Sequence, residues 1–228
     1  MLVEGPYDRQ RLSVLSNLFN EDKLVLIPFG TDVLTGKDYY LDYENKIKEL
    51  LNKEKTNEFS DFGEIVQVCD TDGCFVDDSF IIEDKSLKHI VYEANKIKAI
   101  DFKSLEGKRI NKRKNIEELL SSSTIKIYYN STNIDHAFDG IQNPTDAQKR
   151  TQAILMYNRY KNDGVAFIKR LIGLCPSLNG FEESWDFIKI GFNSLGQYTN
   201  LAYFVVDHFD CLKDEFKKLV SSTFTVAK

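Results

Sequence analysis

Short apolar runs alternate with amphipathic segments along the first 130 residues of the chain. The runs are rich in Val, Ile, Leu and Tyr, which favour buried strands, and they span residues 2–3, 24–27, 64–69 and 124–129. Between them, apolar residues at helical spacing predict helices over residues 8–19, with Asp8 as N-cap, and over residues 39–51. Strands that alternate with helices predict right-handed β-α-β units and therefore a mainly parallel sheet.

An insertion at about residues 73–122 interrupts this alternation. Its first part, to residue 87, is acidic and predicted to be irregular, and residues 89–100 predict a hairpin that turns near Asn95. Towards the end of the insertion, the apolar residues predict a further helix around residues 116–120.

Beyond residue 130 the apolar spacing becomes helical and stays so. Helices are predicted over residues 132–139, 145–161, 163–174, 181–191 and, with a break, 198–220. We therefore expect two regions. Residues 1–130 form an α/β domain, and residues 131–228 form a helical region packed on it.

The composition is that of an ordinary globular protein. Of the 228 residues, 42% are apolar and 29% are charged, which separates the chain from disordered sequences. No apolar run approaches the roughly 18 residues that cross a bilayer, and the first residues do not resemble a signal peptide. Four scattered cysteines do not suggest a disulfide framework, so we expect a reduced, cytoplasmic protein.

The net charge of -5 at first argues against nucleic acid as a partner, because surfaces that bind phosphates are basic. Between residues 70 and 84, however, six acids occur with no Lys or Arg, so the remainder of the chain carries +1. A basic run follows the acids at residues 108–114. We predict that its cations contact a nucleic-acid backbone, although a solvated helix face explains them equally well. These cations are Lys108, Arg109, Lys112, Arg113 and Lys114.

Carboxylates follow two of the predicted strands. Glu4 comes after the first, and Asp70 and Asp72 follow the strand at residues 64–69. Functional groups collect beyond the carboxyl ends of parallel strands, and residues i and i+2 of an extended segment face the same way. Three such side chains repel one another unless a cation lies between them, and Mg²⁺ prefers carboxylate oxygens. The pattern therefore predicts a Mg²⁺ site; the alternative is that residues 70–73 form only a turn.

These residues also resemble the motifs of TOPRIM domains. Residues 2–8 are similar to the opening V-E-G-x-x-D motif, Gly30 to the glycine after the second strand, and residues 68–72 to the third-strand D-x-D. The resemblance implies a TOPRIM-like (Rossmann-like) α/β fold with a mainly parallel sheet, helices on both faces and a helical C-terminal half. It also implies Mg²⁺-dependent phosphodiester chemistry, as in topoisomerases, primases and OLD-type nucleases. In that family the two aspartates of D-x-D hold Mg²⁺, or Mn²⁺ in its place, and the equivalent of Glu4 is a general acid or base or a further ligand.

A second, partial resemblance narrows the family. Residues 129–136 are similar to the S-N-P-x-F-E-x-W segment of RloB-like and AbiL-type TOPRIM proteins of bacterial phage defence, with Asp135 in place of Glu and Thr132 in place of Pro. The layout also resembles that of the PARIS effector. The resemblance implies an endonuclease that acts on DNA or tRNA as the toxic effector of anti-phage defence. Because the chain has no G-x-x-x-x-G-K-[ST] loop, we expect an ATPase partner to control it, and we also consider a homodimer.

Two other functions stay open, a primase-like nucleotidyl transferase and a non-catalytic binding or regulatory subunit. Residues expected around the metal ligands are Asp8, Gly30 and Asp135. Asp8 has an alternative role as a helix cap. Asp77 and Asp78 are candidates for a second metal but are more simply solvated loop acids, and His136 more simply makes a structural hydrogen bond.

Overall fold

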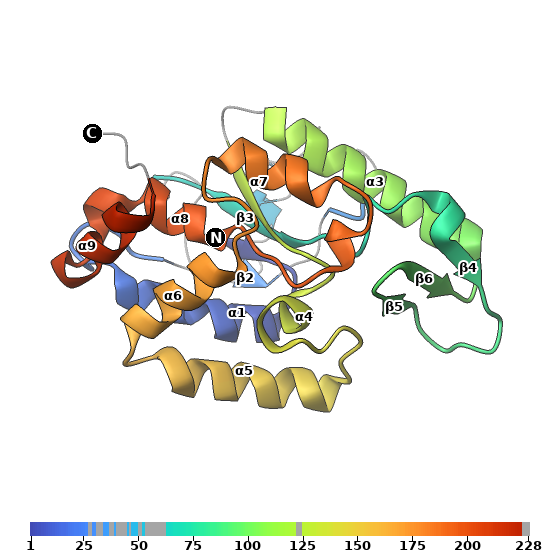
Figure 1. The fold of residues 1–228 in the computed structure, drawn as a ribbon, viewed down its shortest axis with the longest axis horizontal. Coiled ribbons are helices and arrows are strands. Elements are labelled where there is room, and N and C mark those ends of the chain that lie inside the picture. Colours follow the sequence, from blue (N-terminus) through green and yellow to red (C-terminus); the bar gives the residue numbers. More distant parts are fainter. Residues whose placement is uncertain are drawn as a thin grey trace.

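A four-stranded parallel sheet in the order β2-β1-β3-β7 forms the centre of the molecule (Figure 1). The strands are β1 (Leu2–Val3), β2 (Phe29–Gly30), β3 (Val66–Asp70) and β7 (Lys126–Asn130). The computed structural model describes residues 1–26, 29–30, 34–36, 39, 45, 47–49, 52, 63–121 and 125–224. The predicted α/β fold with a mainly parallel sheet is thereby confirmed, and β1, β3 and β7 begin and end within two residues of their predicted bounds.

Helices cover both faces of this sheet because successive residues of a strand point to opposite sides. Val66, Val68 and Tyr128 point to one side, and Cys69, Ile127 and Tyr129 point to the other. The first side is covered by α1 (Pro6–Leu12), α4 (Ile134–Asp139), α5 (Asp146–Tyr160), α6 (Gly164–Leu174), α8 (Leu201–Asp207) and α9 (Asp214–Thr223). The second side is covered by α3 (Phe102–Ser121) and α7 (Phe181–Ile188). Figure 1 shows α3 and α7 above the strands and α1, α5 and α6 below them.

The first helix begins earlier than predicted. It starts at Pro6 with Gly5 as N-cap, because proline has a helical φ and needs no hydrogen-bond partner at the first helical position. Asp8 falls within the first turn, so its prediction as the N-cap is wrong. After Leu12 the chain tightens into a 3-10 helix (Ser13–Leu18), whose apolar side chains are fully buried as their spacing predicted.

The strand predicted at residues 24–27 is wrong in its described part. These residues adopt no strand, and the Val25 side chain is 70% exposed. The strand that pairs with β1 is instead β2, in which Gly30 lies opposite Val3. The last residue of the predicted strand and most of the helix predicted over residues 39–51 lie outside the described residues.

The insertion forms a small second sheet and a long helix. The small sheet has the order β4-β6-β5 and consists of β4 (Ile81–Glu83), β5 (Val91–Glu93) and β6 (Lys96–Ala99). The hairpin of β5 and β6 turns at Asn95 as predicted, whereas β4 lies in a segment wrongly predicted to be irregular. Helix α3 begins at Phe102, earlier than predicted, and therefore contains the whole basic run. Figure 1 shows the small sheet at one end of the molecule, beside the start of α3.

Helices α4 to α9 begin and end close to their predicted bounds, and the predicted break in the last segment separates α8 from α9. Buried residues from both halves of the chain, such as Leu12 and Val68 with Phe167 and Leu201, form one hydrophobic cluster. Among the described residues, no helix is both long enough and apolar enough to span a membrane.

Arg11 of α1 is fully buried and joins this helix to α4. Its guanidinium pairs with Asp135 and, at 2.5 Å, with Asp139. A buried charge is strongly unfavourable unless it is paired, so these contacts are what allows Arg11 to be buried between α1 and α4.

We expect Arg11→Met to lower the free energy of unfolding by about 3–5 kcal/mol, because the carboxylates of Asp135 and Asp139 lose their cation. Urea denaturation followed by circular dichroism measures the loss. Arg9→Met is the control, because Arg9 lies on the same helix with an exposed side chain. Equal stabilities of the two variants would contradict the structural role of the ion pairs.

Candidate functional site

The carboxyl ends of β1 and β3 open onto a pocket with a volume of about 900 Å³. Its acidic lining residues are Glu4, Asp8, Asp70, Asp72, Asp135 and Asp146. The chain runs from β1 outward to β2 and returns to β3 on the other side, so the strand order reverses between β1 and β3. Groups that follow two such strands face a common crevice. The structure thus brings the predicted metal ligands together with Asp8 and Asp135.

Asp70 is hydrogen-bonded to both neighbouring strand ends. Its backbone N–H donates to Glu4 Oε1 at 3.0 Å, and Asn130 Nδ2 donates to Asp70 Oδ1 at 3.2 Å. Asp70 and Asn130 are directly opposite each other in the ladder between β3 and β7. The register of the parallel sheet therefore sets the positions of the Glu4, Asp70 and Asn130 side chains.

Asp72 does not continue the strand. β3 ends at Asp70, and the backbone of Asp72 is left-handed, with a φ of 48°. Its N–H donates to the carbonyl of Thr132 at 2.9 Å. The argument from alternation along an extended strand is therefore wrong here, because Asp70 ends the strand and a turn at residues 71–74, closed by the Cys74 N–H donating to the Thr71 carbonyl at 2.8 Å, follows it. Both aspartates nevertheless line the pocket, because the turn returns Asp72 to the end of the sheet.

Lys112 reaches the acids of the pocket from α3. Its side chain is only 1% exposed, and its Nζ lies 2.8 Å from Glu4 Oε1 and pairs with Asp72 Oδ2. The hydroxyl of Tyr92 donates to the other oxygen of Asp72, at 3.3 Å. A single ammonium group thus bridges the carboxylates that follow β1 and β3.

Arg109 is the second buried cation of the basic run. Its side chain is 4% exposed, and it donates to the carbonyls of Gly73, at 3.3 Å, and Val76, and pairs with Asp78. The prediction that Arg109 and Lys112 contact nucleic acid is therefore wrong, because both side chains bind groups of the protein itself.

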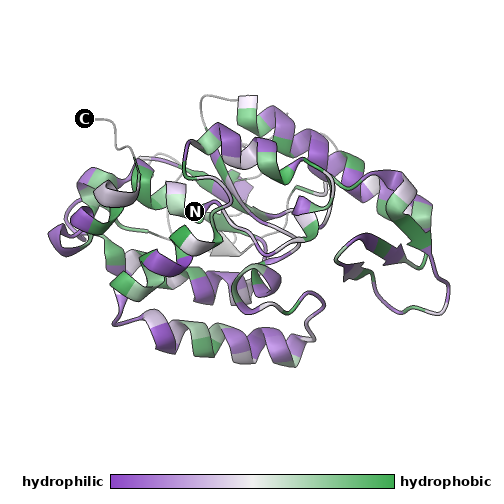
Figure 2. Cartoon of the chain, in the orientation of Figure 1, coloured by the Kyte–Doolittle hydropathy of each residue, from purple (hydrophilic) through white to green (hydrophobic). Residues whose placement is uncertain are grey.

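The remaining cations of the run, Lys108, Arg113 and Lys114, have exposed side chains. Figure 2 shows mostly hydrophilic residues along α3, where these cations lie. They are not among the residues that line the pocket. Their contact with nucleic acid stays a prediction.

Negative charge exceeds positive charge around the pocket. Burial raises the pKa of Asp70 well above its usual range, and the carboxylates of Glu4 and Asp8 raise it further. Lys112 opposes these effects but does not outweigh them. Burial and the carboxylate of Asp135 likewise raise the pKa of Asp8 to about 6. A further cation in the pocket would therefore be strongly attracted.

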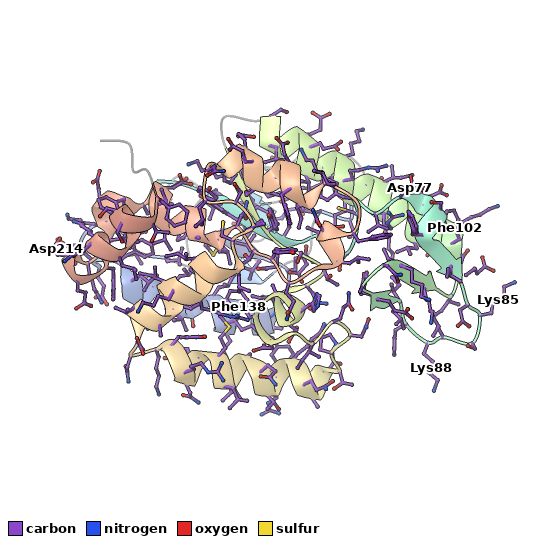
Figure 3. The ribbon with its side chains drawn as sticks, in the orientation of Figure 1. Asp77, Lys85, Lys88, Phe102, Phe138 and Asp214 are labelled. Carbon is purple, nitrogen blue, oxygen red and sulfur yellow. The ribbon has the colours of Figure 1, made fainter. Side chains whose placement is uncertain are left out.

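The other candidates lie around or away from the pocket. Gly30 belongs to β2, beside β1. Figure 3 shows Asp77 at the end of the molecule that carries the small sheet, where it caps a short 3-10 turn, and Asp78 pairs with α3. His136 lies within hydrogen-bond distance of a neighbouring threonine, 3.3 Å from its hydroxyl.

The wall opposite the strand ends was not predicted. It comes from the hairpin of the small sheet and from the loop between α4 and α5. The Tyr92 N–H donates to Asn143 Oδ1, and Asn143 Nδ2 donates to the Tyr92 carbonyl, each at 2.8 Å. We call this pair the Tyr92–Asn143 clamp. His89 and Lys149 are the basic residues of the lining. No local sequence pattern pairs Tyr92 with Asn143, which lie far apart in the sequence.

Mg²⁺ fits the pocket by ligand chemistry but not by the present arrangement of the ligands. Carboxylate oxygens are the ligands that it prefers. Within the described part of the chain, however, no group of three or more His, Cys, Asp or Glu side chains is placed to hold a metal ion. Lys112 already bridges Glu4 and Asp72, so a metal ion shared by these acids has to replace contacts of the ammonium group.

Comparisons with family models, with curated proteins and with solved structures found no match to this chain. The link to TOPRIM domains therefore rests on the V-E-G-x-x-D and D-x-D motifs. The acids of these motifs, Glu4, Asp8, Asp70 and Asp72, line one pocket.

We expect Asp8→Asn to stabilise the protein at neutral pH. The folded-state pKa of about 6 lies above the unfolded value of ~3.9, so the stability that Asp8 contributes is present below about pH 4 and is lost as the pH rises through 6. The variant avoids this loss, which amounts to about 3 kcal/mol at most.

Urea denaturation from about pH 4 to about pH 8 tests this expectation, because the difference in the free energy of unfolding between variant and wild type should widen as the pH rises. Asp186→Asn, an exposed position on α7, is the control. If this difference in the free energy of unfolding did not change with pH, the raised pKa of Asp8 would be contradicted.

Proposed function

We propose that this chain is a TOPRIM-type, metal-dependent endonuclease that hydrolyses phosphodiester bonds in DNA or tRNA. The observation that carries the proposal is the acidic pocket between the ends of β1 and β3, which is lined by the acids of two TOPRIM-like motifs. Ligands of open α/β sheets bind where the strand order reverses. Groups with shifted pKa values in a concave site are the usual marks of an active site.

The side chains would divide the work as follows. Asp70 and Asp72 would hold Mg²⁺, or Mn²⁺ in its place, and Glu4 would act as general base or as a further ligand. When bound, one or two such cations would supply the polarisation of a phosphate oxygen and a lowered pKa of bound water. Asn130 and Tyr92 orient the two aspartates through the hydrogen bonds that they donate.

The size of the pocket favours a substrate of which only the nucleotides around the cleavage site enter the pocket. A volume of about 900 Å³ is in the range for small ligands, so it suits the nucleotides around one scissile phosphate better than a whole duplex. Single-stranded loops and ends of nucleic acid offer such nucleotides. The exposed cations of α3, Lys108, Arg113 and Lys114, would then bind backbone phosphates outside the pocket.

We further propose that the activity belongs to the cytoplasmic toxic effector of a bacterial anti-phage defence system, controlled by an ATPase partner. The partial match of residues 129–136 to defence-type TOPRIM proteins supports this role. We include an ATPase partner in the proposal because this sequence carries no phosphate-binding loop of its own.

A non-catalytic binding or regulatory subunit is the second candidate. The specific observation in its favour is that Lys112 already forms ion pairs with Glu4 and Asp72. A pocket with a permanent internal cation would need no metal ion.

We expect the wild-type chain, with its ATPase partner where one is required, to cleave DNA or tRNA in Mg²⁺ and to lose this activity in chelator. Asp70→Asn should lower the rate at least about 100-fold, because it removes a metal ligand. Gel electrophoresis of labelled DNA and tRNA measures cleavage. Asp186→Asn, an exposed aspartate outside the pocket, should leave the rate unchanged.

Cleavage that survived Asp70→Asn would show that the metal site is assigned wrongly. If no nucleic acid were cut even with the partner present, the result would favour the binding subunit.

We expect the double variant Lys108→Glu and Arg113→Glu to weaken nucleic-acid binding and to flatten its salt dependence. Each lost phosphate contact lowers the slope of log K against log salt by about 0.9 on duplex DNA. Fluorescence anisotropy in chelator, at several salt concentrations, measures the slope. Lys218→Glu, on α9 at the other end of the molecule (Figure 1), is the control. An unchanged slope of log K against log salt would show that Lys108 and Arg113 do not contact the nucleic acid.

A further inference from the structure

The buried position of Lys112 is the most unusual feature of the pocket. A lysine normally keeps its ammonium group in water, yet here the side chain is 1% exposed. The ammonium group pairs with Glu4, at 2.8 Å, and with Asp72. It therefore stands between acids that follow two different strands, in a pocket lined by several carboxylates.

The placement of Lys112 is built into α3. Arg109, Lys112 and Asn115 recur at intervals of three residues and lie along one side of a helix. Arg109 donates to the turn after β3, and Asn115 donates to the carbonyls of Leu34 and Gly36, at 2.6 and 2.7 Å. Because contacts on either side of Lys112 anchor the helix, the ammonium group is held at the acids.

The contacts of Lys112 are the kind that a divalent cation makes. Both oxygens of Asp72 already accept a hydrogen bond or ion pair, Oδ1 from Tyr92 and Oδ2 from Lys112. A metal ion bound to the same carboxylates would lie within a few ångströms of the ammonium group, and two cations at such a distance repel each other strongly.

We propose, on the basis of the metal-dependent function above, that Lys112 is the resident cation of this site and competes with the divalent metal ion for Glu4 and Asp72. In the metal-free chain it holds the acids together. Binding of the metal ion requires the ammonium group to leave at least one of them. Lys112 is thus a positioning residue that keeps the site closed to metal until α3 or the lysine side chain shifts.

The test is Mn²⁺ binding by the full chain, with free Mn²⁺ measured by electron paramagnetic resonance. We expect Lys112→Met to bind Mn²⁺ at least about tenfold more tightly than the wild type, because it removes the competing cation and leaves the acids unneutralised. Arg113→Met, the adjacent exposed cation on the same helix, should bind Mn²⁺ like the wild type. Lys112→Arg, which keeps the positive charge, should bind it no more tightly than the wild type.

Equal or weaker binding of Mn²⁺ by Lys112→Met would overturn the proposal, because lysine and metal ion would then not compete. A second measurement needs no variant. Amine-reactive labelling of Lys112 in the wild type, quantified by mass spectrometry, should become faster in Mn²⁺ as the ammonium group is released. An unchanged rate with Mn²⁺ bound would also overturn it.

The same titrations separate the proposal from the function on which it rests. If none of these proteins bound Mn²⁺, the metal-dependent nuclease itself would be contradicted. If wild type and Lys112→Met bound Mn²⁺ equally tightly, only the proposed competition between Lys112 and the metal ion would be contradicted.

Discussion

Repulsion among the carboxylates that follow β1 and β3 is the constraint on which the arrangement of this protein depends. Parallel pairing brings Glu4 and Asp70 to the same edge of the sheet, and a turn adds Asp72. Such a group of acids is unfavourable without cations. Lys112 meets this demand from α3, and a second buried cation, Arg11 of α1, pairs with Asp135, another acid of the pocket lining.

The insertion between β3 and β7 therefore belongs to the site and is more than a surface addition. Its helix supplies Lys112, and its hairpin supplies Tyr92, and both bind Asp72. The Tyr92–Asn143 clamp then connects the hairpin to the loop before α5, so that two distant parts of the chain enclose the pocket. A movement of the small sheet or of α3 would alter the surroundings of Asp72 directly.

The elements that sequence patterns predicted correctly are those with strong local preferences. The strands at Val66–Asp70 and Lys126–Asn130 are rich in apolar residues and are packed against hydrophobic clusters on both faces. Residues 24–27 have the same composition, but Val25 is exposed and β2 pairs with β1 instead, because pairing depends on partners that are distant in sequence. The helix cap predicted at Asp8 failed for a local reason, since Pro6 starts the helix earlier.

The sequence by itself determined the parallel α/β fold and the presence of carboxylates at two strand ends, because apolar periodicity and chain order are local properties. Only the tertiary structure decided what each charge does. Charged residues surround α3, so its pattern does not indicate which side faces the sheet, and packing alone turned Lys112 inward and left Arg113 exposed. The same holds for Asp72, whose place in the pocket depends on a left-handed turn bound to Thr132, a residue 60 positions further along the chain. A charge acquires its role from the groups that folding brings within a few ångströms of it, and that distance is not a property of the sequence pattern.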